Sequence, residues 1–229
     1  MATQSTYLTN IRAKLDEVTS GQWTDAEIRS WINEGARDVA RRTETLQSTA
    51  LINVDPNVQE YNLDGDYLRV HRVEWRPNSS SQVYPLEYRD FNSMDAVWWS
   101  SQTTSKGYPS FYTMWGYPPS LKIILYPTSS EAGKLKMFYY LTPTDLATDG
   151  TAAGSTVKVP SGYEDLVEAY AEMVALRKDR DPRWQEARTL YMDSLNGLID
   201  RSRRWTDQGD FIQVGNRHLP GWLWGGDDY

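Results

Sequence analysis

The chain has 229 residues, 39% of them hydrophobic and 24% charged, so it can bury a core large enough to fold without disulfides or a structural metal. It contains no cysteine, which excludes disulfides, thiolate metal sites and a cysteine nucleophile. Its net charge of −7 disfavours tight binding to nucleic acid, because phosphate-binding proteins usually carry a basic excess. Neither a signal peptide nor a transmembrane helix is expected.

Aromatic residues make up 13% of the chain, with 15 Tyr and 10 Trp against 4 Phe. Tyrosine and tryptophan combine a large apolar body with a polar group, which suits half-buried positions at interfaces. A β-rich core that uses many of these residues would have the same composition. Both interpretations stay open at this point.

Two helices are expected first. Apolar residues recur at helical spacing between residues 5 and 18. The second helix begins at Thr24, and Glu27 three residues later completes the signature of a capping box. This helix pair forms the predicted domain 1–44.

The hydrophobic period then changes to two, which indicates an antiparallel β domain over residues 45–160. Runs at 51–54 and 58–63 flank the turn signal Asp55-Pro56-Asn57 and predict a hairpin. The last part, 143–156, is rich in Thr, Ala, Gly and Asp and is expected to be a mobile loop. Further strands are predicted at 67–76, 83–88, 110–115, 121–126 and 135–141.

Helical spacing returns in the predicted domain 161–206. Ser161 and Glu164 match a second capping box, and Asp181-Pro182 is typical of the start of another helix. Terminal helix pairs must bury their apolar stripes against each other. The sequence therefore predicts an α+β fold, in which a helical bundle from N- and C-terminal helix pairs carries an inserted antiparallel β-sheet domain.

The remaining segment, 207–229, is both glycine-rich and apolar and is predicted to be an extended C-terminal arm. Large apolar side chains are rare in disordered segments, so they should be buried somewhere. They could fold back over the chain itself, but we favour docking on another subunit. The candidate partner-binding residues are Phe211, Ile212, Arg217, His218, Leu219, Trp222, Leu223 and Trp224.

No pattern of residues indicates catalysis. Only His71 and His218 occur, and the chain has no G-x-S-x-G, H-E-x-x-H or glycine-rich phosphate loop. The 31 carboxylates leave a glycosidase pair open without indicating one. Asp64-Gly65-Asp66 lacks the further ligands of a calcium loop and is interpreted as a turn. We expect no enzyme activity, no catalytic residue, no metal and no cofactor.

A carbohydrate-binding module is the alternative from another functional class. Aromatic side chains gather in the strand region and could form a platform that stacks against sugars. Two pairs of helices around the sheet are unusual for such a module. The platform residues would be Trp98, Trp99, Tyr108, Tyr112, Trp115 and Tyr117.

Several segments, taken in order, resemble the head-to-tail adaptor (connector, or head completion) proteins of tailed bacteriophages. Residues 23–41, W-T-D-A-E-I-R-S-W-I-N-E-G-A-R-D-V-A-R, are similar to the second helix of that family. The run 107–112, G-Y-P-S-F-Y, precedes strands that end in Tyr-Pro at 126–127 and in Tyr-Tyr-x-x-Pro at 139–143. The similarity covers about residues 5–200.

This resemblance implies a structural subunit of the virion, made in the host cytoplasm, with no membrane association. It implies an oligomeric ring between portal and tail, commonly a dodecamer, that conducts DNA through its lumen without specific binding during ejection. The helical part would bind the portal, often through the C-terminal arm. The β part would face the tail nozzle or tube, with Trp98, Trp99 and Tyr108 as candidate tail-facing residues. A different tail or baseplate subunit remains an alternative.

Overall fold

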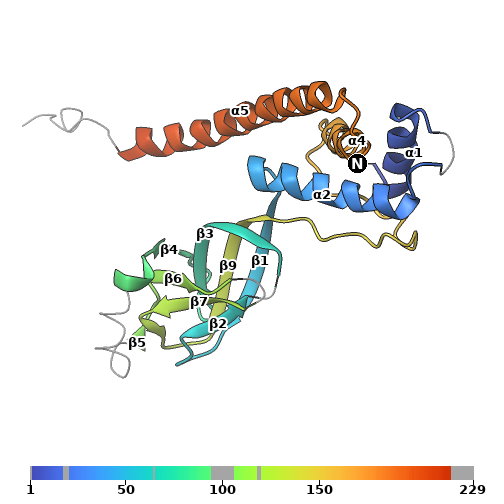
Figure 1. Cartoon of the computed structure of the whole chain (residues 1–229). Coiled ribbons are helices and arrows are strands. Elements are labelled where there is room, and N and C mark those ends of the chain that lie inside the picture. The colour runs from blue at the N-terminus through green and yellow to red at the C-terminus, as the bar shows by residue number, and fades with distance from the viewer. Residues whose placement is uncertain (1, 18–20, 64, 94–105, 118–119, 218–229) are drawn as a thin grey trace, which may run out of the picture. The chain divides into compact units, whose positions relative to one another are not determined.

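A computed structural model describes the backbone of residues 2–17, 21–63, 65–93, 106–117 and 120–217, and the side chains up to residue 203 (Figure 1). The chain divides into two compact units. The helical unit consists of Met1–Thr45 together with Asp145–Tyr229, and the β unit consists of Leu46–Thr144. The chain thus leaves the helical unit once, forms the β unit, and returns.

The helices of the helical unit begin and end at clear signals. The capping box predicted at Thr24 is confirmed: its hydroxyl accepts a hydrogen bond of 3.3 Å from the Glu27 N–H, and the Glu27 carboxylate accepts one of 3.0 Å from the Thr24 N–H. The second predicted capping box does not form, because the Glu164 carboxylate accepts from the Gly162 N–H instead, at 2.8 Å. The helices are α1 (Gln4–Lys14), α2 (Asp25–Thr43), α4 (Asp165–Lys178) and α5 (Trp184–Arg217).

An extended segment, residues 145–160, packs with these helices, and we call it the strap. The Asn33 side chain donates a hydrogen bond of 2.8 Å to the Leu146 carbonyl and accepts one of 3.1 Å from the Leu146 N–H. Such pairing satisfies polar groups that burial removes from water. The sequence-based boundaries placed this segment in the β domain. Here it adds Val157 and Val159, which are 4% and 1% exposed, to the helical core.

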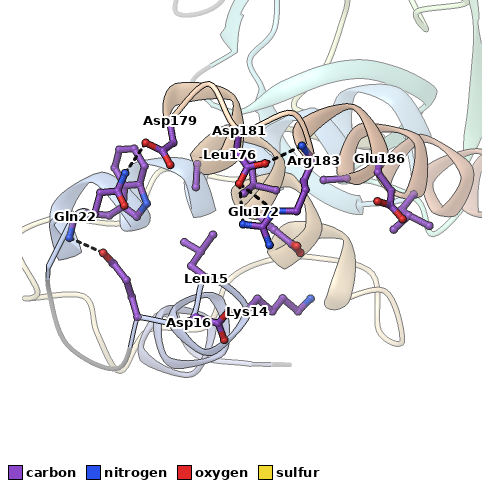
Figure 2. Close-up of a pocket in the computed structure, with 15 residues that line it drawn as sticks. Lys14, Leu15, Asp16, Gln22, Glu172, Leu176, Asp179, Asp181, Arg183 and Glu186 are labelled. Atoms are coloured by element: carbon purple, nitrogen blue, oxygen red, sulfur yellow. Dashed lines mark hydrogen bonds and ion pairs between the residues drawn. The ribbon is translucent and has the colours of Figure 1, made fainter.

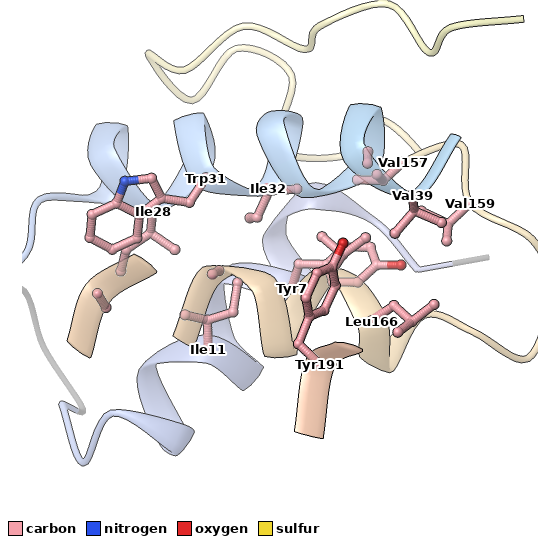
Figure 3. Packing of buried hydrophobic residues seen from close by; sticks show 14 of the residues in the cluster. Tyr7, Ile11, Ile28, Trp31, Ile32, Val39, Val157, Val159, Leu166 and Tyr191 are labelled. Carbon is pink, nitrogen blue, oxygen red and sulfur yellow. The ribbon is translucent and has the colours of Figure 1, made fainter. Parts of the chain in front are cut away.

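The helical core contains side chains from every helix of the unit and from the strap (Figure 3). Apolar residues of α2 recur every three or four positions, which places them on one face of the helix. Helix α5 contributes Tyr191, which is 2% exposed, together with Leu195 and Leu198. Fully buried members are Tyr7, Ile11, Ile28, Ile32, Val39, Leu166, Val167, Ala171 and Leu195.

The β unit is a curled seven-stranded sheet with a small second sheet (Figure 1). Its order is β1-β9-β3-β4-β6-β7-β2, and only β4 and β6 are parallel neighbours in it. Strands β5 and β8 form the two-stranded parallel sheet. The strands are β1 (Gln47–Val54), β2 (Glu60–Leu63), β3 (Tyr67–Pro77), β4 (Tyr84–Tyr88), β5 (Lys106–Gly107), β6 (Phe111–Trp115), β7 (Leu121–Tyr126), β8 (Thr128–Ser129) and β9 (Gly133–Leu141).

The predicted hairpin between β1 and β2 is wrong. β1 pairs along its length with β9, and β2 pairs with β7 at the other end of the sheet order. Val54 lies opposite Gly133, whereas the Gln59 carbonyl already accepts a hydrogen bond of 3.0 Å from Leu125. The intervening turn therefore carries the chain from one edge strand to the other.

The predicted fold class, a bundle of N- and C-terminal helix pairs with an inserted antiparallel sheet, is also wrong. The fold is mixed α+β, and its sheet includes the parallel pair β4–β6. The helices pack around a shared core together with the strap and do not form a bundle of two helix pairs. The strap supplies Val157 and Val159 to the helical core, although it is not a helix. Helical periodicity alone does not reveal such a contribution.

Candidate interaction sites

Most of the predicted site residues lie where the structure describes no side chain. Helix α5 continues to Arg217, so the first part of the predicted extended arm is helical. The side chains of Phe211, Ile212 and Arg217 lie outside the described residues. The same holds for the whole of His218, Leu219, Trp222, Leu223, Trp224, Trp98 and Trp99.

Tyr108 is the predicted tail-facing residue that the structure describes, and it belongs to an aromatic cluster. Its ring centroid lies 4.8 Å from that of Trp75 and 5.3 Å from that of Tyr84. Trp75 points inward from β3 and is fully buried, and Tyr84 is its register partner on β4. Tyr108 itself is 42% exposed. We call Trp75, Tyr84 and Tyr108 the aromatic ledge.

The polar end of the aromatic ledge has a defined partner. The Tyr108 hydroxyl shares a hydrogen bond with Glu131, which raises the pKa of that hydroxyl. The half-exposed ring of Tyr108 can pack against a partner, and its protonated hydroxyl can hydrogen-bond to that partner. The partly exposed Tyr108 ring and its hydroxyl make the aromatic ledge suited to binding a partner.

The aromatic platform of the carbohydrate-binding alternative is only partly exposed. Tyr112 is 5% exposed because it faces the sheet core, so it cannot stack on a ligand. Trp115 is 56% exposed and stacks against Phe91, with 4.3 Å between the ring centroids. Tyr117 is 87% exposed. Alternation along β6 turns its aromatic residues to opposite faces, so they form no single platform.

A pocket of 310 Å³ lies in the helical unit (Figure 2). It is formed by the end of α1, the end of α4 and the start of α5. The Gln22 side chain donates a hydrogen bond of 2.7 Å to Asp179, and Arg183 pairs with Asp181 at 2.7 Å. The remaining charged lining residues are Lys14, Asp16, Glu17, Glu172 and Glu186, so acidic groups predominate.

The lining of this pocket includes an exposed apolar residue. Leu190 fits the apolar stripe of α5 but is 61% exposed.

Within the described part of the chain, no group of three or more His, Asp or Glu residues could hold a metal ion. His71 is exposed on β3, and its ring lies 6.0 Å from that of Tyr140. Among the described residues, no helix is long and apolar enough to cross a membrane.

Comparison with known proteins identifies a family for this arrangement. The family model described as SU10 adaptor protein matches residues 2–218, which includes both structural units. A search of curated proteins finds no match. The match over nearly the whole chain agrees with the adaptor resemblance of the sequence. The chain belongs to the SU10 adaptor protein family, a family of structural adaptor proteins of phages.

Proposed function

We propose that this chain is a subunit of the ring that connects the phage head to the tail, between the portal protein and the tail. DNA passes through the lumen of the ring, which has twelve copies. The observation that carries the proposal is the family match over residues 2–218. The protein is a structural component without catalytic activity or cofactor.

The two ends of the subunit have separate partners in this proposal. The helical unit and the C-terminal segment bind the portal, and the aromatic ledge of the β unit faces the tail. The half-exposed ring of Tyr108 supports the second assignment, because aromatic anchors are enriched at protein interfaces. Leu219, Trp222 and Trp224 lie beyond the family match, so the first assignment rests on their apolar character.

Truncation after Arg217 tests the portal contact and keeps α5 complete. We expect the chain without residues 218–229 to fold normally and to lose its complex with the portal protein of the same phage. The double variant Trp222→Ser/Trp224→Ser should have the same effect. Size-exclusion chromatography with light scattering measures the complex, and circular dichroism verifies the fold.

A matched control changes an aromatic residue of the β unit. Tyr117→Ser changes a side chain that is 87% exposed in the β unit, and portal binding should persist. Portal binding by the truncated chain at full affinity would refute the role of the arm. We also expect the isolated chain to be a monomer that assembles on its partner, because partner contacts must offset the cost of ordering the arm.

The position in the particle requires a separate measurement. A cryo-electron microscopy map of the virion should show a ring of this chain between portal and tail. Density for the chain in a tail tube or baseplate would refute the connector assignment. Family membership would remain intact in that case.

A further inference from the structure

Strands β1, β9 and β3 turn one face away from the core of the β unit, and we call it the outer face. In β9, Leu135 and Met137 point inward and are fully buried, so the alternate residues Lys134 and Lys136 point outward. The strand register then assigns the neighbouring positions to the same side. The outer face consists of Gln47, Thr49, Leu51, Asn53, Arg69, Arg72, Glu74, Arg76, Lys134, Lys136, Phe138 and Tyr140.

Positive charge is concentrated on this face. Residues 46–144 contain eight Lys and Arg and nine Asp and Glu, so the β unit has a net charge of only −1. The one acidic residue of the outer face, Glu74, pairs with Arg72 at 2.7 Å. The face therefore has a net charge of +4 in a chain of net charge −7. The five basic residues, all exposed, are Arg69, Arg72, Arg76, Lys134 and Lys136.

The arrangement of these charges includes a pair that should repel each other. Arg76 lies directly opposite Lys134 in the antiparallel register of β3 and β9. Like charges opposite each other on neighbouring strands repel and destabilise the sheet. A bound polyanion would reverse that effect. This pairing is thus the feature of the face that points to a ligand.

The aromatic rings of the outer face are already covered by cations. The Lys136 ammonium lies 4.7 Å from the centroid of the Phe138 ring, and the Arg69 guanidinium lies 5.8 Å from that of Tyr140. Tyr140 is 6% exposed. These rings are therefore not free to stack against a base or a sugar. The face presents cations and hydrogen-bond donors.

The composition of the face favours a nucleic acid over a protein partner. Lysine and other charged residues are depleted in the centre of protein–protein interfaces, whereas protein–DNA interfaces are polar and strongly positive. Gln47 and Thr49 line a hollow of 430 Å³ on this side of the sheet. Together with Asn53, they are of the residue types that hydrogen-bond to phosphate oxygens.

We propose that the outer face binds the phosphate backbone of duplex DNA without reading its bases. The three rows of side chains on β1, β9 and β3 are about 4.8 Å apart, so several phosphates can be contacted together. The net charge of the chain lowers the affinity but does not cancel the local attraction, because fields are screened beyond about 8 Å at physiological salt. Binding should be weak and strongly dependent on salt.

Fluorescence anisotropy with the full chain and a labelled duplex of about 20 base pairs tests the proposal, over about 50 to 200 mM salt. The logarithm of the binding constant should fall linearly with the logarithm of the salt concentration. Lys134→Ala/Lys136→Ala should lower the magnitude of this slope by about 1.8, because each lost phosphate contact contributes about 0.9. Arg76→Gln, an independent single variant, should lower it by about 0.9.

Lys122→Ala/Lys158→Ala is the matched control, since it changes the net charge equally at two lysines outside the outer face. The proposal holds if this control keeps the slope of the unaltered chain. Equal slopes for both double variants would overturn it, since binding would then follow net charge. Undetectable binding at the lowest salt would also overturn it. So would variants that bind DNA normally but lose a phage protein partner, which would make the face a protein interface.

Discussion

The hydroxyl of Tyr191 lies 2.6 Å from the carboxylate of Asp38 and donates a hydrogen bond to it, which joins α5 to α2. Tyr191 is 2% exposed, and its ring packs edge-on against Tyr170 with 5.5 Å between centroids. Burial, together with this hydrogen bond, raises the pKa of the Tyr191 hydroxyl above its ordinary value. The group is therefore protonated, and able to donate, at neutral pH. Asp38 also accepts from Arg42 at 3.0 Å, so its charge is shared between two donors.

Replacing Tyr191 by phenylalanine should lower the free energy of unfolding by about 1–2 kcal/mol, because it removes a hydrogen bond to a charged acceptor and keeps the ring. Urea denaturation followed by tryptophan fluorescence measures the change. Leu190→Ala alters the adjacent residue, which is 61% exposed, and should change stability by less than about 0.5 kcal/mol. Equal stability of Tyr191→Phe and the unaltered chain would show that the hydrogen bond contributes nothing.

Arg12 should be among the most sensitive polar residues of the helical unit. It is 7% exposed, and its guanidinium donates to the Trp23 carbonyl at 3.0 Å and pairs with Glu17 at 3.1 Å and with Asp25. Arg12→Met keeps much of the side-chain volume but leaves both carboxylates without this partner. We expect a loss of about 3 kcal/mol in the free energy of unfolding. Arg41→Met, on the exposed side of α2, should cost less than about 0.5 kcal/mol in the same assay.

The local signal at Thr24 was read correctly from the sequence, whereas the second predicted capping box and the long-range strand pairing were not. Thr24 and Glu27 are three residues apart, so the sequence contains everything that determines the capping box. The partner of β1 is β9, about 80 residues away, and no turn signal specifies that contact. The strap was missed for the same reason. Val157 and Val159 show no helical period, yet the helices leave space that they fill.

The candidate surfaces were also predictable from the sequence only in their local patterns. Lysines alternate with buried residues in β9, and charged residues alternate with Val73 and Trp75 in β3, so each strand showed a polar side in the sequence. That the two polar sides meet follows only from the pairing of β3 with β9. The aromatic ledge likewise needs Tyr108, which is distant in sequence from its partner Trp75. The composition shows that the chain is acidic overall, but it does not show that one face of the β unit is basic.

Stability should depend on pH through Glu27 at the start of α2. Its hydrogen bond with Lys178, followed by those with Thr24, lowers the pKa of the Glu27 carboxyl from 4.5 to about 2. Because the folded-state pKa is below the unfolded-state value, the stabilisation is complete above about 4.5 and is lost as the pH falls to about 2. Glu27→Gln should thus be less stable than the unaltered chain at neutral pH, with a difference that shrinks through this window.

Thermal unfolding followed by circular dichroism across that pH range checks the Glu27 prediction. Glu186→Gln, on the exposed side of α5, is the control for general loss of negative charge. The stability difference of Glu27→Gln should shrink more than that of Glu186→Gln between about pH 4.5 and about pH 2, the window set by the Glu27 carboxyl. A constant difference for Glu27→Gln over the same range would contradict the assignment. It would mean that the side chain acts through packing and not through its charge.

Two glycine-to-alanine variants should change stability in opposite directions. A β carbon at Gly133 would lie 2.6 Å from the Arg76 carbonyl oxygen and 2.9 Å from the Trp75 indole nitrogen, so the β3–β9 pair would have to separate. Gly133→Ala should lower the free energy of unfolding by about 2 kcal/mol or more, as overpacking does in well-packed cores. Gly197 lies in α5 with nothing within 4 Å of the added carbon. Gly197→Ala should raise stability by about 0.5–1 kcal/mol, because alanine loses less backbone entropy in a helix. Urea denaturation of both variants checks the pair, and a Gly133→Ala variant as stable as the unaltered chain would refute the close approach of β9 to Trp75.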